Sequence, residues 1–274
     1  MLELPEALTI ARQMDTAITG RTITRVVVGH SPHKFAFFSD EVDQYPAMLE
    51  GKAITGADAF GGYVRLHAGN AALRLHDGVN VRLYAAGEKR PDKHQLLVEL
   101  DDGAALQCSV QMYGGLWVHV DDSDDNFYYR VALEKPSPLS DAFDRAYFET
   151  ILAEAKLALS AKALLATEQR IPGLGNGVLQ DILLLAGVHP KRKVGQMDDA
   201  TRDKLFAQVK ATLADMTTQG GRNTEKDLYG NPGGYQTLLC AKTAKAPCPI
   251  CGAAVVKQAY MGGSVYFCPT CQPL

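Results

Sequence analysis

Four cysteines near the end of the chain constrain its fold more than any other feature. They form two pairs, Cys248-Pro249-Ile250-Cys251 and Cys268-Pro269-Thr270-Cys271, with sixteen residues between the pairs. Two C-x2-C pairs at this spacing supply four thiolates for a tetrahedral metal, and Zn²⁺ suits four sulfur ligands. A pair of disulfides is the alternative, which the spacing disfavours. We therefore predict one structural Zn²⁺ bound by Cys248, Cys251, Cys268 and Cys271.

The interval between the pairs predicts a hairpin. Two short strand-like runs flank Met261-Gly262-Gly263, which would form the tip. A site with four protein ligands has no open position for a substrate, so the predicted zinc is structural. Such a ribbon is compatible with binding nucleic acid, with binding protein, and with capping a domain.

Length and composition indicate a soluble protein of two domains plus the ribbon. The chain has 274 residues, and no apolar run reaches the roughly 18 residues that span a bilayer. Its acidic N-terminus lacks the features of a signal peptide, and the metal-type cysteine spacing fits a reducing compartment. We expect a cytoplasmic monomer without membrane contact.

The charge is distributed unevenly. Residues 151–274 carry 14 Lys and Arg against 9 Asp and Glu, which leaves 14 against 22 in residues 1–150. A basic second half permits phosphate contacts although the net charge is −3. The asymmetry is compatible with nucleic-acid binding and does not establish it.

The hydrophobic pattern predicts an α+β protein with two lobes. Residues 5–19 show helical periodicity, and strand patterns recur from Thr22 to about Val131, as in an antiparallel sandwich or barrel. Helical periods follow, so the predicted domains are 1–135 (helix and β-sandwich), 136–142 (linker), 143–234 (helical) and 235–274 (zinc finger). Within them, we expect residues 121–126 to be a solvated acidic loop and 220–234 a mobile connection.

A glycine-rich turn precedes one of the predicted helices. Gly173-Leu174-Gly175-Asn176 would let backbone N–H groups at the helix start approach an anion, with Asn176 as cap or phosphate donor. A plain tight turn between two helices explains the same residues equally well.

Taken together, these motifs resemble the formamidopyrimidine-DNA glycosylase / endonuclease VIII family of base-excision repair enzymes. The likeness covers nearly the whole chain. It is carried by Leu2-Glu3-Leu4-Pro5-Glu6, the stretch from Lys162 to Asn176, Ala186-Gly187-Val188-His189-Pro190 and the four cysteines. The resemblance implies two lobes, a helix–two-turns–helix element and damaged or abasic DNA in the cleft between the lobes.

The resemblance also implies a mechanism. A damaged base is flipped out of the duplex, and an N-terminal amine forms a Schiff base with the sugar before the strand is cut. By this likeness the catalytic residues are Met1 or Leu2 as the amine, Glu3 as the proton-transferring carboxylate and Glu6 as a second acidic position. Lys162, Gly175 and Asn176 match the DNA-gripping element. Without the resemblance, Glu3 is also explained as a helix-start carboxylate and Lys162 as a solvated residue.

Several family features differ in this chain. Leu2 replaces the proline whose amine reacts after Met removal; Met1 is expected to remain, which moves the amine outward by one residue. Gly62 stands where a catalytic lysine is expected. By the resemblance, Val79 replaces an intercalating methionine, and Gly262-Gly263 replaces the fingertip arginine that contacts the DNA. An arginine-rich segment is replaced by Val110-Gln111-Met112-Tyr113-Gly114.

Three hypotheses follow from these matches and differences. The first is a DNA glycosylase and abasic-site lyase with altered substrate or reduced activity. The second is a glycosylase-fold protein that binds damaged or structured DNA without cutting it. The third is a zinc-ribbon interaction protein without nucleic acid, which only the overall acidity favours.

Overall fold

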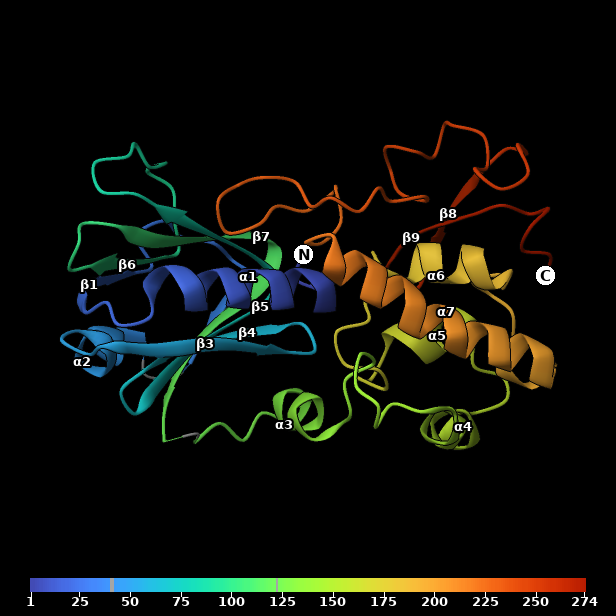
Figure 1. The fold of residues 1–274 in the computed structure, drawn as a ribbon, viewed down its shortest axis with the longest axis horizontal. Helices are drawn as coiled ribbons and strands as arrows, with labels where there is room; N and C mark the ends of the chain where they lie inside the picture. Colours follow the sequence, from blue (N-terminus) through green and yellow to red (C-terminus); the bar gives the residue numbers. More distant parts are fainter. Residues whose placement is uncertain (40–41, 122) are drawn as a thin grey trace.

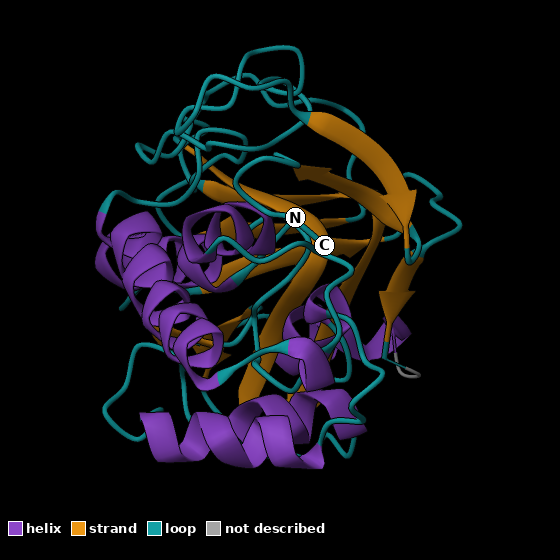
Figure 2. Cartoon of the chain, turned by 90° about the vertical axis from the view of Figure 1, so that its right-hand side faces the viewer, coloured by secondary structure: helices purple, strands orange, loops and turns teal. Residues whose placement is uncertain are grey.

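The chain forms a β-rich lobe and a helical lobe that lie end to end (Figure 1). The computed structural model describes residues 1–39, 42–121 and 123–274. The predicted α+β class, with an N-terminal helix, an antiparallel sheet, a helical lobe and a four-cysteine hairpin, is confirmed. Figure 2 views the molecule from its helical end.

The β-rich lobe contains one seven-stranded sheet in the order β1-β6-β7-β5-β4-β3, with β2 paired to β7. All pairings are antiparallel except that of β2 with β7, which is parallel. The strands are β1 (Ile23–Val28), β2 (Ala36–Phe38), β3 (Ile54–Phe60), β4 (Tyr63–Ala68), β5 (Ala71–Tyr84), β6 (Leu96–Leu100) and β7 (Ala105–Val120).

In place of the expected two-layer sandwich, the lobe contains a single curved sheet whose edge strands, β1 and β3, approach each other at one end. Thr22 bridges to Ala53, and Gly20 N–H donates to the Ile54 carbonyl, so the ends of β1 and β3 meet. The two longest strands, β5 and β7, shift register between Asp77 and Val79. Such a bulge bends the strand pair and redirects nearby side chains. It turns residues around Asp77 toward the helical lobe, beside the start of the chain.

Helix α1 (Leu4–Ile18) belongs to both lobes. Ile10, Met14 and Ile18 recur at helical spacing and are buried in the core of the sheet. Leu4 is instead buried in the core of the helical lobe. The first turn of α1 therefore sits at the junction of the two lobes.

The helical lobe contains α4 (Arg145–Glu154), α5 (Ala161–Ala166), α6 (Leu179–Ala186), the 3-10 turn η2 (Val194–Gln196) and α7 (Asp199–Thr218). Side chains of Asp144, Ser160 and Asp198 accept from backbone N–H groups three residues later and fix where α4, α5 and α7 begin. Helix α6 ends at Gly187, which has φ +73°. The four-cysteine hairpin consists of β8 (Val256–Tyr260) and β9 (Gly263–Phe267).

Two helices interrupt the region that was predicted to contain only strands. They are α2 (Tyr45–Leu49), preceded by the 3-10 turn η1 (Val42–Gln44), and α3 (Phe127–Glu134). Helix α3 begins where the Asn126 side chain accepts from Tyr129 N–H, a capping contact that overrides the strand-like pattern.

The acidic stretch 121–126 was predicted to be a solvated loop, and this is wrong for Asp124. Its carboxylate is buried and forms an ion pair with Arg74. Asp122 lies outside the described residues.

The glycine-rich segment 219–235 has no helix or strand, but it is packed against both lobes. Arg222, Leu228 and Tyr235 are buried, and Leu83 N–H donates to the Leu228 carbonyl. A Cβ on Gly233 would collide with the Gly221 backbone, so glycine here permits close backbone contact. The prediction of a mobile connection is therefore wrong for this segment.

Leu4 in the helical core and Leu228 in the sheet core show that the chain crosses between the lobes more than once. The predicted domain boundaries at 136–142 and 235 stay a prediction. Among the described residues, no helix combines the length and apolar character that crossing a bilayer requires.

Candidate active site at the start of helix α1

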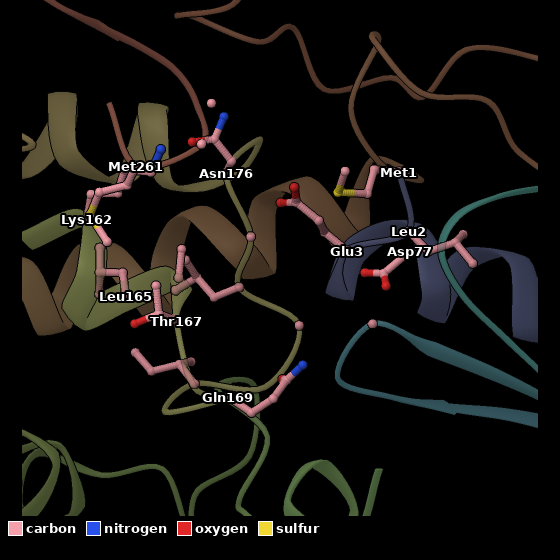
Figure 3. Close-up of a pocket in the computed structure, with 18 of the residues that line it drawn as sticks. Met1, Leu2, Glu3, Asp77, Lys162, Leu165, Thr167, Gln169, Asn176 and Met261 are labelled. Carbon is pink, nitrogen blue, oxygen red and sulfur yellow. The ribbon is translucent and has the colours of Figure 1, made fainter. Parts of the chain in front are cut away.

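A cavity of about 520 Å³ opens where the first residues meet the helical lobe and the tip of the hairpin (Figure 3). Its walls come from the N-terminus, the bulge of β5 and β7, helix α5, the turn before α6 and the β8–β9 tip. Of the predicted catalytic and DNA-binding residues, Met1, Leu2, Glu3, Lys162, Gly175 and Asn176 line this cavity, and Glu6 does not.

Glu3 is the anion held by the glycine-rich turn. Its two carboxylate oxygens accept from the backbone N–H groups of Gly177 and Val178, each at 2.8 Å. A Cβ on Gly175 would lie 2.8 Å from the carboxyl carbon of Glu3, so the glycine makes room for this approach. The turn does bind an anion at a helix start, and the anion belongs to the same chain.

The surroundings of Glu3 act on its pKa in both directions, and burial is the largest effect. Its side chain is 3% exposed, and burial raises its pKa above the ordinary value. Arg222, 3.6 Å from Oε2, acts in the opposite direction, while the nearby carboxylate of Glu6 raises the pKa further. A carboxyl group with a raised pKa on a cavity wall is a candidate for proton transfer.

Glu6 lies behind the cavity in an ion pair with Arg222. Arg222 donates from Nε and Nη2 to the two oxygens of Glu6, at 3.0 and 2.8 Å, and its backbone N–H donates to Oε1 at 3.0 Å. Arg222 is 2% exposed. The buried cluster of Glu3, Glu6 and Arg222 thus joins the first turn of α1 to segment 219–235.

The first two residues are fixed by polar contacts at their backbone. The amine of Met1 donates to Glu225 Oε2 at 2.5 Å, and Leu2 N–H donates to the Asp77 carbonyl at 2.6 Å. The Leu2 side chain is buried in the sheet core. Figure 3 shows Met1, Leu2 and Glu3 on one side of the cavity and Lys162 and Met261 on the other.

The space beside Gly62, where the resemblance expects a lysine, is filled by a histidine. A Cβ on Gly62 would lie 3.0 Å from the Leu2 carbonyl oxygen and 3.4 Å from His76 Nε2. The His76 ring stacks on Tyr63 with centroids 3.9 Å apart, and its Nδ1 lies 3.0 Å from Asp77 Oδ2. The His76 imidazole therefore occupies the part of the cavity wall beside Gly62.

Strand β7 supplies exposed apolar residues to the cavity rim, together with Tyr128 of α3 and Met261 of the hairpin tip, whereas Val79 of β5 does not reach it. Val79, at the position of the family's intercalating residue, is buried in the sheet core. Met112 is 72% exposed and Tyr113 is 40% exposed, and both line the cavity. Met112 has φ +63°, a backbone conformation that turns the strand at this point.

Lys162 and Asn176 both contact the hairpin. Lys162 is 4% exposed, and its Nζ donates to the Tyr260 carbonyl at 2.7 Å. Asn176 Nδ2 donates to the Ser264 carbonyl at 3.1 Å, and the cap of α6 is Val178. Burial lowers the pKa of Lys162. These residues attach the β8–β9 tip to the helical lobe, and their role in gripping DNA stays a prediction.

The four predicted metal ligands are together. Their Sγ atoms lie within 4.8 Å of one another, with 3.9 Å between Cys248 and Cys271 and 3.5 Å between Cys251 and Cys268. A tetrahedron with metal–sulfur distances of about 2.3 Å has sulfur–sulfur edges of about 3.8 Å. These separations are too long for a disulfide bond, which is about 2.05 Å. The cluster can hold one metal ion.

Arg222 and Glu225 are the residues that sequence reasoning missed. Both lie in the segment predicted to be mobile, and each contacts residues more than 200 positions away. The available signal was the cluster of four charged residues within a glycine-rich stretch, Arg222, Glu225, Lys226 and Asp227.

Solved structures of known function share this architecture. A Lactococcus lactis Fpg in complex with abasic-site DNA has a TM-score of 0.84 at 23% identity, covering 99% of this chain and 100% of that one. MutM (Fpg) from Thermus thermophilus has a TM-score of 0.81 at 24% identity, with 98% of each chain covered. The fold is therefore that of the two-lobed Fpg proteins.

Sequence comparison then identifies the family. The formamidopyrimidine-DNA glycosylase N-terminal domain matches residues 1–110. The formamidopyrimidine-DNA glycosylase of Symbiobacterium thermophilum is 30% identical over 282 residues, covering all of this chain and 90% of that protein. That of Bordetella parapertussis is 29% identical, with 99% of each protein covered. The chain belongs to the formamidopyrimidine-DNA glycosylase family.

Proposed function

We propose that this chain binds damaged DNA in the cavity between the lobes and acts as a DNA glycosylase with abasic-site lyase activity. The observation that carries the proposal is Glu3, buried on the cavity wall beside the N-terminal residues. The names of the relatives, and the abasic DNA bound to the Lactococcus lactis protein, support the same substrate class. The cavity volume of about 520 Å³ suits one extruded nucleotide.

The proposed reaction uses an N-terminal amine as nucleophile. The amine forms a bond to the sugar C1′ as the bond from C1′ to the damaged base breaks, and opening of the C1′–O4′ bond then leaves an iminium. The iminium accepts the electron pair released when C2′ loses a proton, and the 3′ phosphate leaves with cleavage of the strand. Glu3 exchanges protons with the sugar or leaving group. Because Met1 carries the amine and Gly62 replaces the expected lysine, we propose an altered substrate or a slower reaction than in relatives with both groups.

We further propose that the four cysteines bind Zn²⁺ and that the hairpin contributes to the DNA surface. Four thiolates match the preference of Zn²⁺, and all four ligand positions come from the protein, so its role is structural. The β8–β9 tip reaches the cavity through Met261, Gly262, Gly263 and Ser264.

The alternative is a DNA-binding protein that has lost the chemistry. Two observations favour it: Leu2 stands where the family has its reactive proline, and no lysine stands at position 62. This alternative predicts tight binding of abasic DNA without strand cleavage.

The test is to measure binding and cleavage together on three duplexes: undamaged, with a formamidopyrimidine, and with an abasic site. The proposal predicts preferential binding of both damaged duplexes and strand scission of each under single-turnover conditions. Preferential binding without scission would support the alternative. Equal, weak binding of all three duplexes would contradict both functions and leave a shared fold. Glu3→Gln serves as the variant that keeps the side-chain shape and loses proton transfer.

A further inference from the structure

The amine of Met1 has a specific partner that comes from the far end of the chain. Glu225 Oε2 lies 2.5 Å from the amine nitrogen, and both side chains are partly exposed. The partners are an ammonium group and a carboxylate, so the contact is a charge-assisted hydrogen bond. A base within hydrogen-bond reach of a nucleophile is the arrangement that activates nucleophiles in enzymes.

The other carboxylates near the amine have different partners. Glu3 accepts from the backbone of Gly177 and Val178, and Glu6 is paired with Arg222. The Asp77 carboxylate lies 3.0 Å from His76 Nδ1. Among the residues that the structure describes, Glu225 is thus the carboxylate in contact with the amine.

Segment 219–235 holds Glu225 in this position. Three residues before it, Arg222 is anchored to Glu6 through three hydrogen bonds. Two residues after it, Asp227 accepts from Gln13 Nε2 of helix α1 at 3.0 Å. The residues on both sides of Glu225 are therefore bound to helix α1, which begins shortly after Met1. This attachment holds the Glu225 carboxylate next to the Met1 amine.

We propose that Glu225 is the proton acceptor that activates the Met1 amine; this rests on the amine mechanism proposed above. Glu225 takes one proton from the ammonium group, and the neutral nitrogen adds to the C1′ aldehyde of an abasic sugar. The proton on the new C–N nitrogen moves to the former aldehyde oxygen, giving a carbinolamine. Glu225 then returns its proton as the hydroxyl leaves as water, and the iminium remains.

Other charged and titratable groups surround the first two residues. They are Glu3 and Glu6 of α1, His76, Asp77 and Arg82 of β5, and Lys226 of the same segment. Glutamine at position 225 removes the proton acceptor and leaves these groups unchanged, so a difference between native and variant profiles belongs to Glu225.

The experiment measures the rate of borohydride trapping on an abasic-site duplex from pH 6 to 9, for the native chain, Glu225→Gln and Glu225→Asp. Intact mass first establishes that Met1 is present. We expect Glu225→Gln to react about 10- to 100-fold more slowly near neutral pH. The loss should shrink at high pH, where hydroxide removes the proton, and Glu225→Asp should recover part of the rate. DNA affinity should change less than twofold, and the exposed Glu154→Gln serves as the matched control.

Each other outcome overturns the inference in a distinguishable way. Equal rates and profiles for the native chain and Glu225→Gln would leave the lyase activity standing and remove Glu225 from it. A faster Glu225→Gln would mean that the carboxylate restrains the amine. Trapping through Leu2 would show that the reacting amine is not the one that Glu225 holds. No trapping by the native chain would contradict the proposed lyase function itself.

Discussion

The N-terminal wall of the cavity and its hairpin wall are both attached to the helical lobe, but by different interactions. The N-terminal wall is joined through buried charges, with Arg222 between Glu3 and Glu6. The hairpin wall is joined through hydrogen bonds to backbone carbonyls, from Lys162 to Tyr260 and from Asn176 to Ser264.

This difference has energetic consequences. A buried ion cluster is costly to break, because removing one member leaves uncompensated charge away from water. A neutral or single-charge hydrogen bond to a carbonyl contributes about 0.5 to 3 kcal/mol. We therefore infer that the N-terminal wall is the rigid side of the cavity and the hairpin the side that adjusts.

Removal of Arg222 should have the largest effect on stability. Arg222→Met leaves Glu3 and Glu6 buried without their cation, and we expect a loss of about 3 to 5 kcal/mol in the free energy of unfolding. Urea denaturation measures it. Arg145→Met, which breaks surface ion pairs with Glu149 and Asp203, is the control and should cost about 1 kcal/mol or less. Similar small losses for both variants would contradict a rigid, charge-held wall.

The hairpin side contains one buried carboxylate whose effect depends on pH. Asp181 of α6 accepts from the backbone N–H groups of Leu238 and Leu239, and burial raises its pKa to about 6. Its folded-state pKa lies above the ordinary value, so its stabilising contribution is complete below about pH 4 and lost as pH rises through about 6. The difference corresponds to about 3 kcal/mol.

Asp181→Asn removes this dependence. Its stability relative to the native chain should therefore improve by about 2 to 3 kcal/mol between about pH 4 and pH 7. Urea denaturation of both proteins at the two pH values measures the change. A difference that is the same at both pH values would mean that Asp181 titrates alike in the folded and unfolded chain.

Loss of the metal should act on the hairpin wall alone. Chelation or Cys248→Ser removes a ligand set on which β8 and β9 depend, and the N-terminal wall is held by the separate cluster around Arg222. We expect the hairpin to unfold, DNA affinity to fall about tenfold, which is about 1.4 kcal/mol, and the rest of the fold to persist. Metal content, backbone NMR spectra and binding titrations check this. Unchanged affinity in the metal-free protein would separate the hairpin from DNA binding.

Lys162→Met should have the smallest effect. Loss of its hydrogen bond to Tyr260 should cost about 1 kcal/mol in hairpin stability. If Lys162 also contacts a phosphate in the complex, the slope of log affinity against log salt should fall by about one. An unchanged slope would assign Lys162 to the hairpin alone.

The sequence predicted those features that local pattern determines. The cysteine spacing specified four sulfurs at one point, and helical periodicity with proline at its start specified α1 and so placed Glu3 at the lobe junction. It could not specify which distant charges pair, because the Arg222–Glu6 contact spans 216 residues and leaves no periodic trace. For the same reason the anion expected in the glycine-rich turn was taken to be phosphate, whereas the fold supplies Glu3.

The rim of the cavity was beyond sequence reasoning for a similar reason. By the resemblance Val79 stands in place of a residue that contacts DNA, but beside the bulge between Asp77 and Val79 it is buried in the core, and Met112 is exposed. A register shift between two long strands depends on their pairing, which neither strand's own sequence specifies.

The most direct test of the central claim is to map the borohydride-reduced adduct between this chain and an abasic-site oligonucleotide by peptide mass. We propose that the chemistry is centred on the N-terminal wall, beside Glu3 and Glu225, and this predicts a single adduct on the Met1 amine. An adduct on a lysine such as Lys162, or none despite tight binding, would contradict it.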